Sequence, residues 1–404
     1  MFPAVGSAQD DGFADEILVT ATRRAESIQT VGLSITALSG ADLQARGAVE
    51  LIDYARSIPN FAFGSTGDGI LANNSVSIRG VEGANTTGFY LDDVPLSETV
   101  DPLVLDVERV EVLRGPQGTL YGARGLGGTI RVITKAPVIG ETSGRVHASV
   151  STVKEGGQTY LVDGAVNFTI NDTMAMRVTG YYQDQDGFID RVVGPSTEPG
   201  VVVPAGTPGA IVGDQLIGAT GEPSPDPFTI EDVDGREIIG GLASLRWQPT
   251  DALTVDGKII AQRTRLFGFP LVDNVTGADA ALGRIVLSAN DTTQESLFIG
   301  DEEQGTDEWV QFSLTGNYET DFGTFTSSTG YFERATNESE ESGEFISFTL
   351  FNIFGNLLRD QDNQGRFVAP LSSPIFQELD FRTFVQEARF VSDFDGPFQM
   401  TAGV

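Results

Sequence analysis

The residue types that carry most enzyme chemistry are scarce in this chain of 404 residues. It has no cysteine, which excludes disulfide bonds and thiol chemistry, and a single histidine, His147, which argues against a histidine metal cluster or a Ser-His-Asp triad. General base catalysis would fall to carboxylates, and adjacent pairs occur at Asp92-Asp93 and Glu302-Glu303. Most such acidic runs are solvated loop faces. We therefore predict no catalytic residue, no metal site and no cofactor.

A glycine-rich segment is the other candidate for chemistry. Glycines let a backbone cradle phosphates, and they also make tight turns and close strand crossings. Neither GxGxxG nor GxxxxGK[ST] occurs between Gly115 and Gly128. The β-branched run Thr129–Thr134 predicts a strand where a nucleotide-binding loop needs a helix. The segment is therefore interpreted as turns between the strands at residues 107–113 and 129–134.

Charge divides the chain into two parts. The formal net charge of −32 excludes nucleic acid as a partner, because phosphates would be repelled. Residues 26–137 carry 8 basic and 13 acidic side chains, whereas residues 138–404 carry 15 and 40. The first part alternates short strands, polar loops and helical signals, such as a helix capped by Ser39 and ended by Gly47. We expect residues 25–137 to form one compact α+β domain.

The second part repeats segments of about ten residues that alternate apolar and polar side chains, and nine such strands are counted. Tight turns follow the second, fourth, sixth and eighth strands. Long acidic segments, at about 187–235, 267–307 and 336–379, follow the third, fifth and seventh. Since antiparallel strands alternate in direction, all tight turns lie on one side, as in an outer-membrane barrel; a soluble sandwich has no reason to sort its loops.

A barrel in lipid must close, because an open edge leaves unpaired backbone groups. Nine strands therefore predict an incomplete, antiparallel membrane β-barrel over residues 138–404, with further strands missing at the C-terminal end. No run approaches the ~20 apolar residues that a spanning helix requires.

Residues 1–24 are interpreted as a flexible N-terminal segment. Its first eight residues end in small side chains and resemble the tail of a signal peptide, although a disordered terminus explains them equally well. A short β-prone run follows, which could add as a strand to a partner's sheet or form the first strand of the next domain. It comprises Glu16, Ile17, Leu18, Val19, Thr20 and Ala21.

The order of these motifs resembles the TonB-dependent outer-membrane receptor family. The run Glu16–Ala21 is similar to a TonB box. Three stretches resemble the hallmark strands of the family's plug domain: Ser77-Ile78-Arg79-Gly80-Val81, Tyr90-Leu91-Asp92-Asp93-Val94-Pro95 and the stretch from Val107 to Pro116. The rest of the family's pattern is matched by Leu120-Tyr121-Gly122, Gly127-Gly128 and Ile133-Thr134-Lys135.

The resemblance implies a transporter of the bacterial outer membrane. A plug would block the barrel, and substrate would bind on the external side. TonB, driven by an inner-membrane motor, would then pair with the box and pull. Arg79 and Arg114 match plug arginines that pair with barrel glutamates, and we expect their partners in the missing strands. Solvated surface arginines are the alternative.

The resemblance also implies substrate contacts on three apical plug loops, at Gly64–Asn74, Gly83–Thr87 and about Ser97–Asp101. Their polar side chains Asp68, Asn85, Thr86 and Glu98 are the candidates, although most such residues only satisfy loop backbone. A ferric siderophore is the default substrate, with a glycan, a vitamin or another metal complex as alternatives. A secreted carbohydrate-active β-protein and a plain porin are the competing classes. Outer-membrane lipid and lipopolysaccharide are expected partners, and acidic loops could hold divalent cations bridging to lipopolysaccharide.

Overall fold

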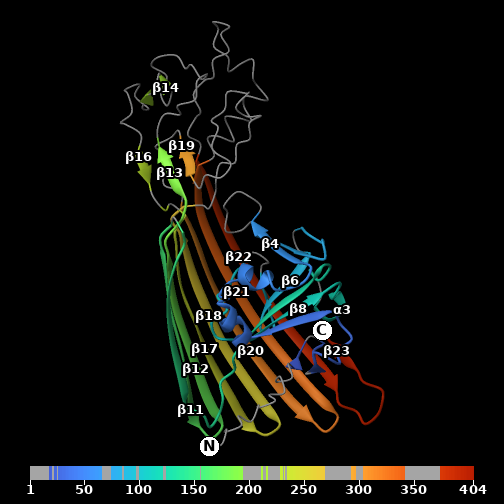
Figure 1. Cartoon of the computed structure of the whole chain (residues 1–404). Helices are drawn as coiled ribbons and strands as arrows, with labels where there is room; N and C mark the ends of the chain where they lie inside the picture. Colours follow the sequence, from blue (N-terminus) through green and yellow to red (C-terminus); the bar gives the residue numbers. More distant parts are fainter. Residues whose placement is uncertain are drawn as a thin grey trace, which may run out of the picture.

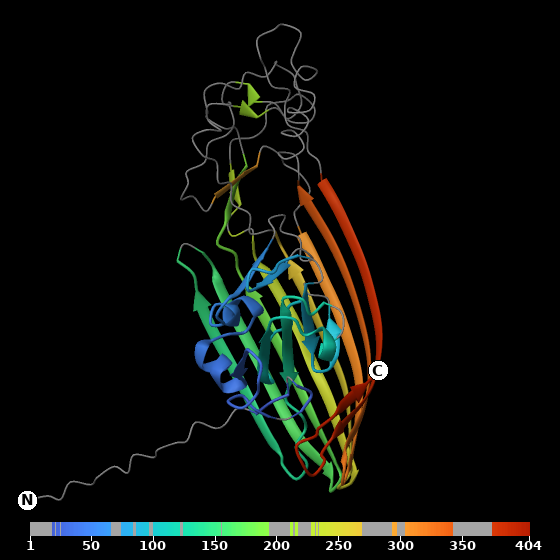
Figure 2. The same ribbon diagram turned by 90° about the vertical axis from the view of Figure 1, so that its right-hand side faces the viewer.

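A long curved sheet wraps around a smaller domain in the computed structural model (Figures 1 and 2). The structure describes residues 18–20, 22–24, 26–65, 74–83, 86–96, 100–121, 124–154, 156–193, 211–212, 215–216, 228–230, 232, 234–268, 293–296, 304–341 and 374–404. The smaller domain lies against the concave face of the sheet (Figure 2).

The long sheet has nine antiparallel strands in sequence order, as predicted. In the described part of the chain its edges are the first and last of these strands. They are β10 (Ser143–Thr152), β11 (Gln158–Asn171), β12 (Met174–Gln185), β17 (Arg236–Thr250), β18 (Leu253–Leu266), β20 (Gln304–Thr320), β21 (Gly323–Glu341), β22 (Pro374–Ser392) and β23 (Thr401–Gly403).

The tight turns gather at one end of the long sheet, at the bottom of Figure 1. Two residues each join β11 to β12, β17 to β18, and β20 to β21. The long segments connect β12 to β17, β18 to β20, and β21 to β22. The connections after the second, fourth and sixth strands are therefore short and those after the third, fifth and seventh are long, as predicted. The predicted tight turn after the eighth strand is a longer connection, residues 393–400.

Side chains of the long sheet alternate between a polar concave face and an apolar convex face. On β12, for example, the buried Thr179 and Gln183 alternate with the exposed Val178. The same period places large apolar side chains outward on neighbouring strands, among them Tyr160, Val162, Val166, Phe168, Ile239, Leu245, Trp247, Ile259, Phe312, Leu314, Tyr318, Phe325 and Phe384. A sheet with an apolar outer face and a polar interior is the arrangement of a membrane barrel.

The smaller domain is built on a five-stranded sheet of order β3-β8-β9-β6-β7. Its strands β6 and β9 run parallel, and its other pairs are antiparallel. The strands are β3 (Ile35–Ser39), β6 (Thr87–Leu91), β7 (Val94–Leu96), β8 (Val107–Arg114) and β9 (Gly128–Thr134). A separate hairpin joins β4 (Phe61–Ser65) to β5 (Asn74–Ile78), and a pair of two-residue strands joins β1 (Leu18–Val19) to β2 (Glu26–Ser27).

The helices of the smaller domain are short: α1 (Gly40–Arg46), α2 (Leu51–Ala55) and α3 (Gly118–Tyr121). The caps of α1 are those predicted. Asp42 N–H donates to Ser39 Oγ at 3.0 Å, and Gly47 adopts a φ of 66°, in the left-handed region that favours glycine. Helix α3 was missed, since glycines dominate its surroundings.

The glycine-rich segment packs strands closely, which agrees with its interpretation as turns and crossings. A Cβ on Gly128 would meet the backbone oxygen of Leu113 and lie 2.8 Å from Ile78 Cδ1. Gly115 has a φ of 104°. Outside this segment the sequence analysis missed five short strands: β13 (Asp190–Val193), β14 (Ile211–Val212), β15 (Gln215–Leu216), β16 (Phe228–Ile230) and β19 (Thr293–Ser296).

The hydrophobic core is shared between the two parts. Buried side chains of the smaller domain, such as Ile78, Phe89 and Val110, form one cluster with inward-facing side chains of the long sheet, such as Trp309 and Phe332. The smaller domain is therefore packed into the sheet rather than tethered beside it.

Candidate functional site

Strand β1, which carries part of the predicted TonB box, is docked on the smaller domain. It pairs antiparallel with β2, in the register Leu18 to Ser27 and Val19 to Glu26. Val19 has no exposed surface. Glu16, Ile17 and Ala21 lie outside the described residues, so the box assignment stays a prediction.

Thr20 anchors this strand to a buried charged network on β8 and β9. Its N–H donates to Glu111 Oε1 at 2.9 Å, and its hydroxyl accepts from Arg109 Nη2 at 3.1 Å and Arg131 Nη1 at 2.8 Å. Glu111 is fully buried and also accepts from Arg109 Nε and Arg131 Nη1, both at 2.8 Å. Buried charge of this kind persists only when each group has partners, and here the partners extend to the N-terminal strand.

Arg23 continues the network from the N-terminal segment to the long sheet. Its Nη1 lies 2.6 Å from Asp93 Oδ1 and its Nη2 3.3 Å from Glu387 Oε2 on β22. The guanidinium also lies 4.6 Å from the ring centroid of Tyr121, a cation–π contact. Burial would raise the pKa of Asp93, but the charges of Arg131 and Arg23 outweigh it and lower that pKa.

Other contacts between the domain and the sheet pair domain carboxylates with sheet cations. Lys258 Nζ contacts Asp92 Oδ2 at 3.0 Å, while Arg177 donates to both oxygens of Asp106 at 2.6 and 2.7 Å. Arg236 pairs with Glu50. Burial would raise the pKa of Asp106, but the hydrogen bonds from Arg177 and Thr179, with the charges of Arg177 and Arg145, outweigh it and lower that pKa. These three ion pairs therefore have the opposite polarity to the expected arginine latch, whereas the pair of Arg23 with Glu387 has the same polarity.

The expected latch arginines lie elsewhere. Arg79 is exposed, with its Nη1 next to Gly115, and Arg114 Nη1 donates to the carbonyl of Pro59 at 3.3 Å. Within the described ranges neither arginine forms an ion pair, so the latch remains a prediction.

Of the four predicted substrate contacts, only Thr86 is described. Its hydroxyl donates to Gly83 O at 2.8 Å, and its own carbonyl accepts from Gly127 N–H at 2.9 Å. Thr86 thus ties its loop to the residue that precedes β9. Asp68, Asn85 and Glu98 lie outside the described residues.

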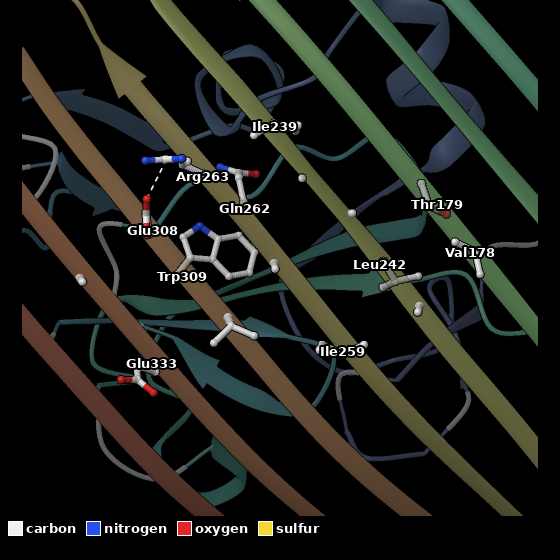
Figure 3. Close-up of a pocket in the computed structure, with 16 residues that line it drawn as sticks. Val178, Thr179, Ile239, Leu242, Ile259, Gln262, Arg263, Glu308, Trp309 and Glu333 are labelled. Atoms are coloured by element: carbon white, nitrogen blue, oxygen red, sulfur yellow. Dashed lines mark ion pairs between the residues drawn. The ribbon is translucent and has the colours of Figure 1, made fainter.

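A hollow of about 770 Å³ lies on the convex face of the long sheet (Figure 3). Val178, Ile239 and Ile259 line it, and an ion pair of 2.7 Å between Arg263 Nε and Glu308 Oε1 borders it. Its lining also includes the buried Gln262 and Trp309, so the hollow extends between the strands of the sheet.

Among the described residues, no three His, Asp or Glu side chains are grouped so that they could hold a metal ion. No helix in that part of the chain is long and apolar enough to cross a membrane.

Sequence reasoning missed Arg23, Arg109, Arg131 and their partners. A weak signal was available: Arg109 and Glu111 share one face of the otherwise apolar β8, and Arg131 stands opposite Glu111 on β9. Charged side chains on a buried strand face indicate a compensated network.

The fold is an open, curved sheet of nine antiparallel strands, of the membrane-barrel type, with a smaller domain packed on its concave face. The family model of the TonB-dependent receptor plug domain matches residues 27–129. An iron-regulated outer membrane virulence protein of Vibrio cholerae is 31% identical over 203 residues, which are 46% of this chain and 30% of that protein. A vitamin B12 transporter of Vibrio vulnificus is 27% identical over 191 residues, which are 45% of this chain and 30% of that protein.

The solved ferric yersiniabactin uptake receptor of Yersinia pestis superposes with a TM-score of 0.62 at 20% identity, covering 92% of this chain and 47% of that receptor. The chain spans about half the length of that receptor and less than a third of the two Vibrio relatives. Residues 27–129 therefore form a plug domain of the TonB-dependent receptor type, and nine strands of a barrel-type sheet lie around it.

Proposed function

We propose that the receptor containing this chain imports a scarce nutrient, with a ferric siderophore as the first candidate, by TonB-driven movement of the plug. The observation that carries the proposal is the docking of the N-terminal strand. A β-prone segment ahead of the plug is held by a single network that also reaches the barrel through Glu387. Such a segment can be released to add as a strand to a partner's sheet.

Two features support iron uptake as the first candidate. The V. cholerae relative is described as iron-regulated, and the Y. pestis receptor as a ferric yersiniabactin uptake receptor. Growth of a deletion strain on a panel of ferric chelates tests this: complementation should restore growth on at least one chelate. Rescue must disappear when residues 16–21 are deleted, and uptake that persists without them would contradict energy coupling.

A neutral substrate is the second candidate. Residues 187–235, 267–307 and 336–379 together carry 4 basic and 23 acidic side chains. An anionic ferric chelate would be repelled by external segments of this charge. Adding a vitamin and neutral glycans to the same growth panel separates the two candidates.

A further inference from the structure

A cluster of carboxylates joins helix α2 to the barrel, away from the network that holds the N-terminal strand. Glu50 is buried, pairs with Arg236 on β17, and accepts from Gln183 Nε2 on β12 at 3.5 Å. Both oxygens of Asp101 accept from the N–H of Leu51, at 3.0 and 3.3 Å. Asp101 lies at the end of the third predicted apical loop.

The charges of this cluster do not balance. Asp53 accepts from two backbone N–H groups, those of Val49 at 3.0 Å and Glu50 at 3.1 Å, which stabilise its negative charge. Arg236 compensates Glu50. In the described part of the chain, Asp101 receives only the one N–H donor, beside the charge of Glu50.

An unused acceptor lies in the same cluster. Gln183 is 3% exposed, and its Nε2 donates to Glu50 and, at 3.3 Å, to Gln185 Oε1. Its Oε1 is buried and has no donor within the described residues. A buried carbonyl is rarely left without a donor, and a protonated carboxyl group in this cluster would supply one.

We propose that Asp101 carries a proton in the resting receptor, and that this proton fastens the plug segment 100–106 to the barrel wall. The groups facing Asp101 and Glu50 are Asp53 and Tyr54 on α2, Arg236 on β17, and Gln183 on β12. Burial, followed by the repulsion of Glu50, raises the pKa of Asp101 to about 8, which agrees with a protonated state at neutral pH.

The protonation of Asp101 affects the attachment of the plug to the barrel, because the segment 100–106 is hydrogen-bonded to the barrel strand β18. Gln262 Nε2 on β18 donates to Asp101 O at 3.0 Å, and Gln262 Oε1 accepts from Leu103 N–H at 3.1 Å. Losing the proton would place a second negative charge beside Glu50 and loosen this attachment at the base of the apical loop. Since the folded protein holds the proton and the unfolded chain loses it near the ordinary pKa of 3.8, stability falls as pH rises from about 4 to about 8.

Asp101→Asn tests the proposal, because the amide keeps an acceptor for Leu51 N–H without a titrating proton. Thermal unfolding of the detergent-solubilised receptor is measured from pH 5 to pH 9. The parent Tm should fall by several degrees over this range, and the decline should be clearly smaller in the variant. Asp53→Asn is the matched control: it should lower the Tm at every pH and keep the parent slope.

The parent slope persisting in Asp101→Asn would overturn the proposal. So would stabilisation of the parent by added Na⁺ or Ca²⁺ at pH 8 that the variant lacks, since a metal ion would then supply the missing charge. The readout requires neither substrate nor TonB. The pH dependence of the Tm can therefore be observed even if the transport proposal is wrong, and the transport proposal can hold even if this pH dependence is absent.

Discussion

Arg23 contacts three parts of the receptor at once, namely the plug turn at Asp93, the ring of Tyr121 and the barrel at Glu387. Its side chain is 5% exposed. Removing one partner of a buried ion pair costs about 3–5 kcal/mol, and each 1.4 kcal/mol changes an equilibrium about tenfold. We therefore expect Arg23→Gln to release the N-terminal strand.

The chain has no cysteine, so Leu18→Cys introduces a unique label site. Thiol labelling at this site should be ~10-fold faster or more in Arg23→Gln than in the parent. Arg24→Gln is the control, because among the described residues Arg24 donates to uncharged acceptors, Ser392 O and Met400 O among them, both at 2.9 Å. Equal labelling of both variants would show that Arg23 does not hold the strand.

The lowered pKa of Asp93 makes a second prediction at the residue scale. A carboxylate with a depressed pKa stabilises the fold above its ordinary pKa of 3.8, and this contribution is lost as pH falls through the lower folded value. A spin label at Leu18→Cys should therefore stay immobile at pH 5 and become mobile only below about 3.8. Asp93→Asn should be mobile at pH 7. Release of the parent strand between pH 5 and 7 would contradict this account.

At the scale of elements, the pairing of β8 with β9 depends on glycine at position 128, because there is no room for a side chain there. A methyl group at Gly128 would contact the backbone of Leu113 and the side chain of Ile78. Overpacking of this kind typically costs about 1–3 kcal/mol. Gly128→Ala should lower the urea midpoint of plug unfolding accordingly. Gly118→Ala, which has open space and lies in α3, should leave it unchanged or raise it.

The helices and strands could be predicted from the sequence far better than the charged contacts that join the N-terminal segment, the plug and the barrel. The nine barrel strands were predictable because their period of two is local and strong, and α1 because Ser39 and Gly47 cap it. Helix α3 could not be predicted, because the glycines around it favour turns. The contacts of Thr20 with Glu111 and of Arg23 with Glu387 span 91 and 364 residues, so no local pattern encodes them.

On the whole-molecule scale, plug and barrel are joined by pairs in which the plug supplies most of the carboxylates. Asp92, Asp106 and Glu50 meet Lys258, Arg177 and Arg236. The N-terminal segment reverses this polarity, because Arg23 brings the cation to Glu387. Pulling the N-terminal segment would therefore load a different set of contacts from the three ion pairs that join the plug to the barrel.

Two lysine substitutions test whether the convex face of the long sheet lies in lipid. Val178 points outward from β12 in the apolar band, where a lysine should cost about 2–4 kcal/mol, whereas near the interface the cost falls to about 0–1. Val178→Lys should reduce the heat-modifiable, folded receptor recovered from outer membranes. Asp380→Lys, exposed toward the outer end of β22, should assemble like the parent. If both variants assembled equally, the convex face would not lie in lipid, because only a hydrocarbon environment distinguishes the two positions.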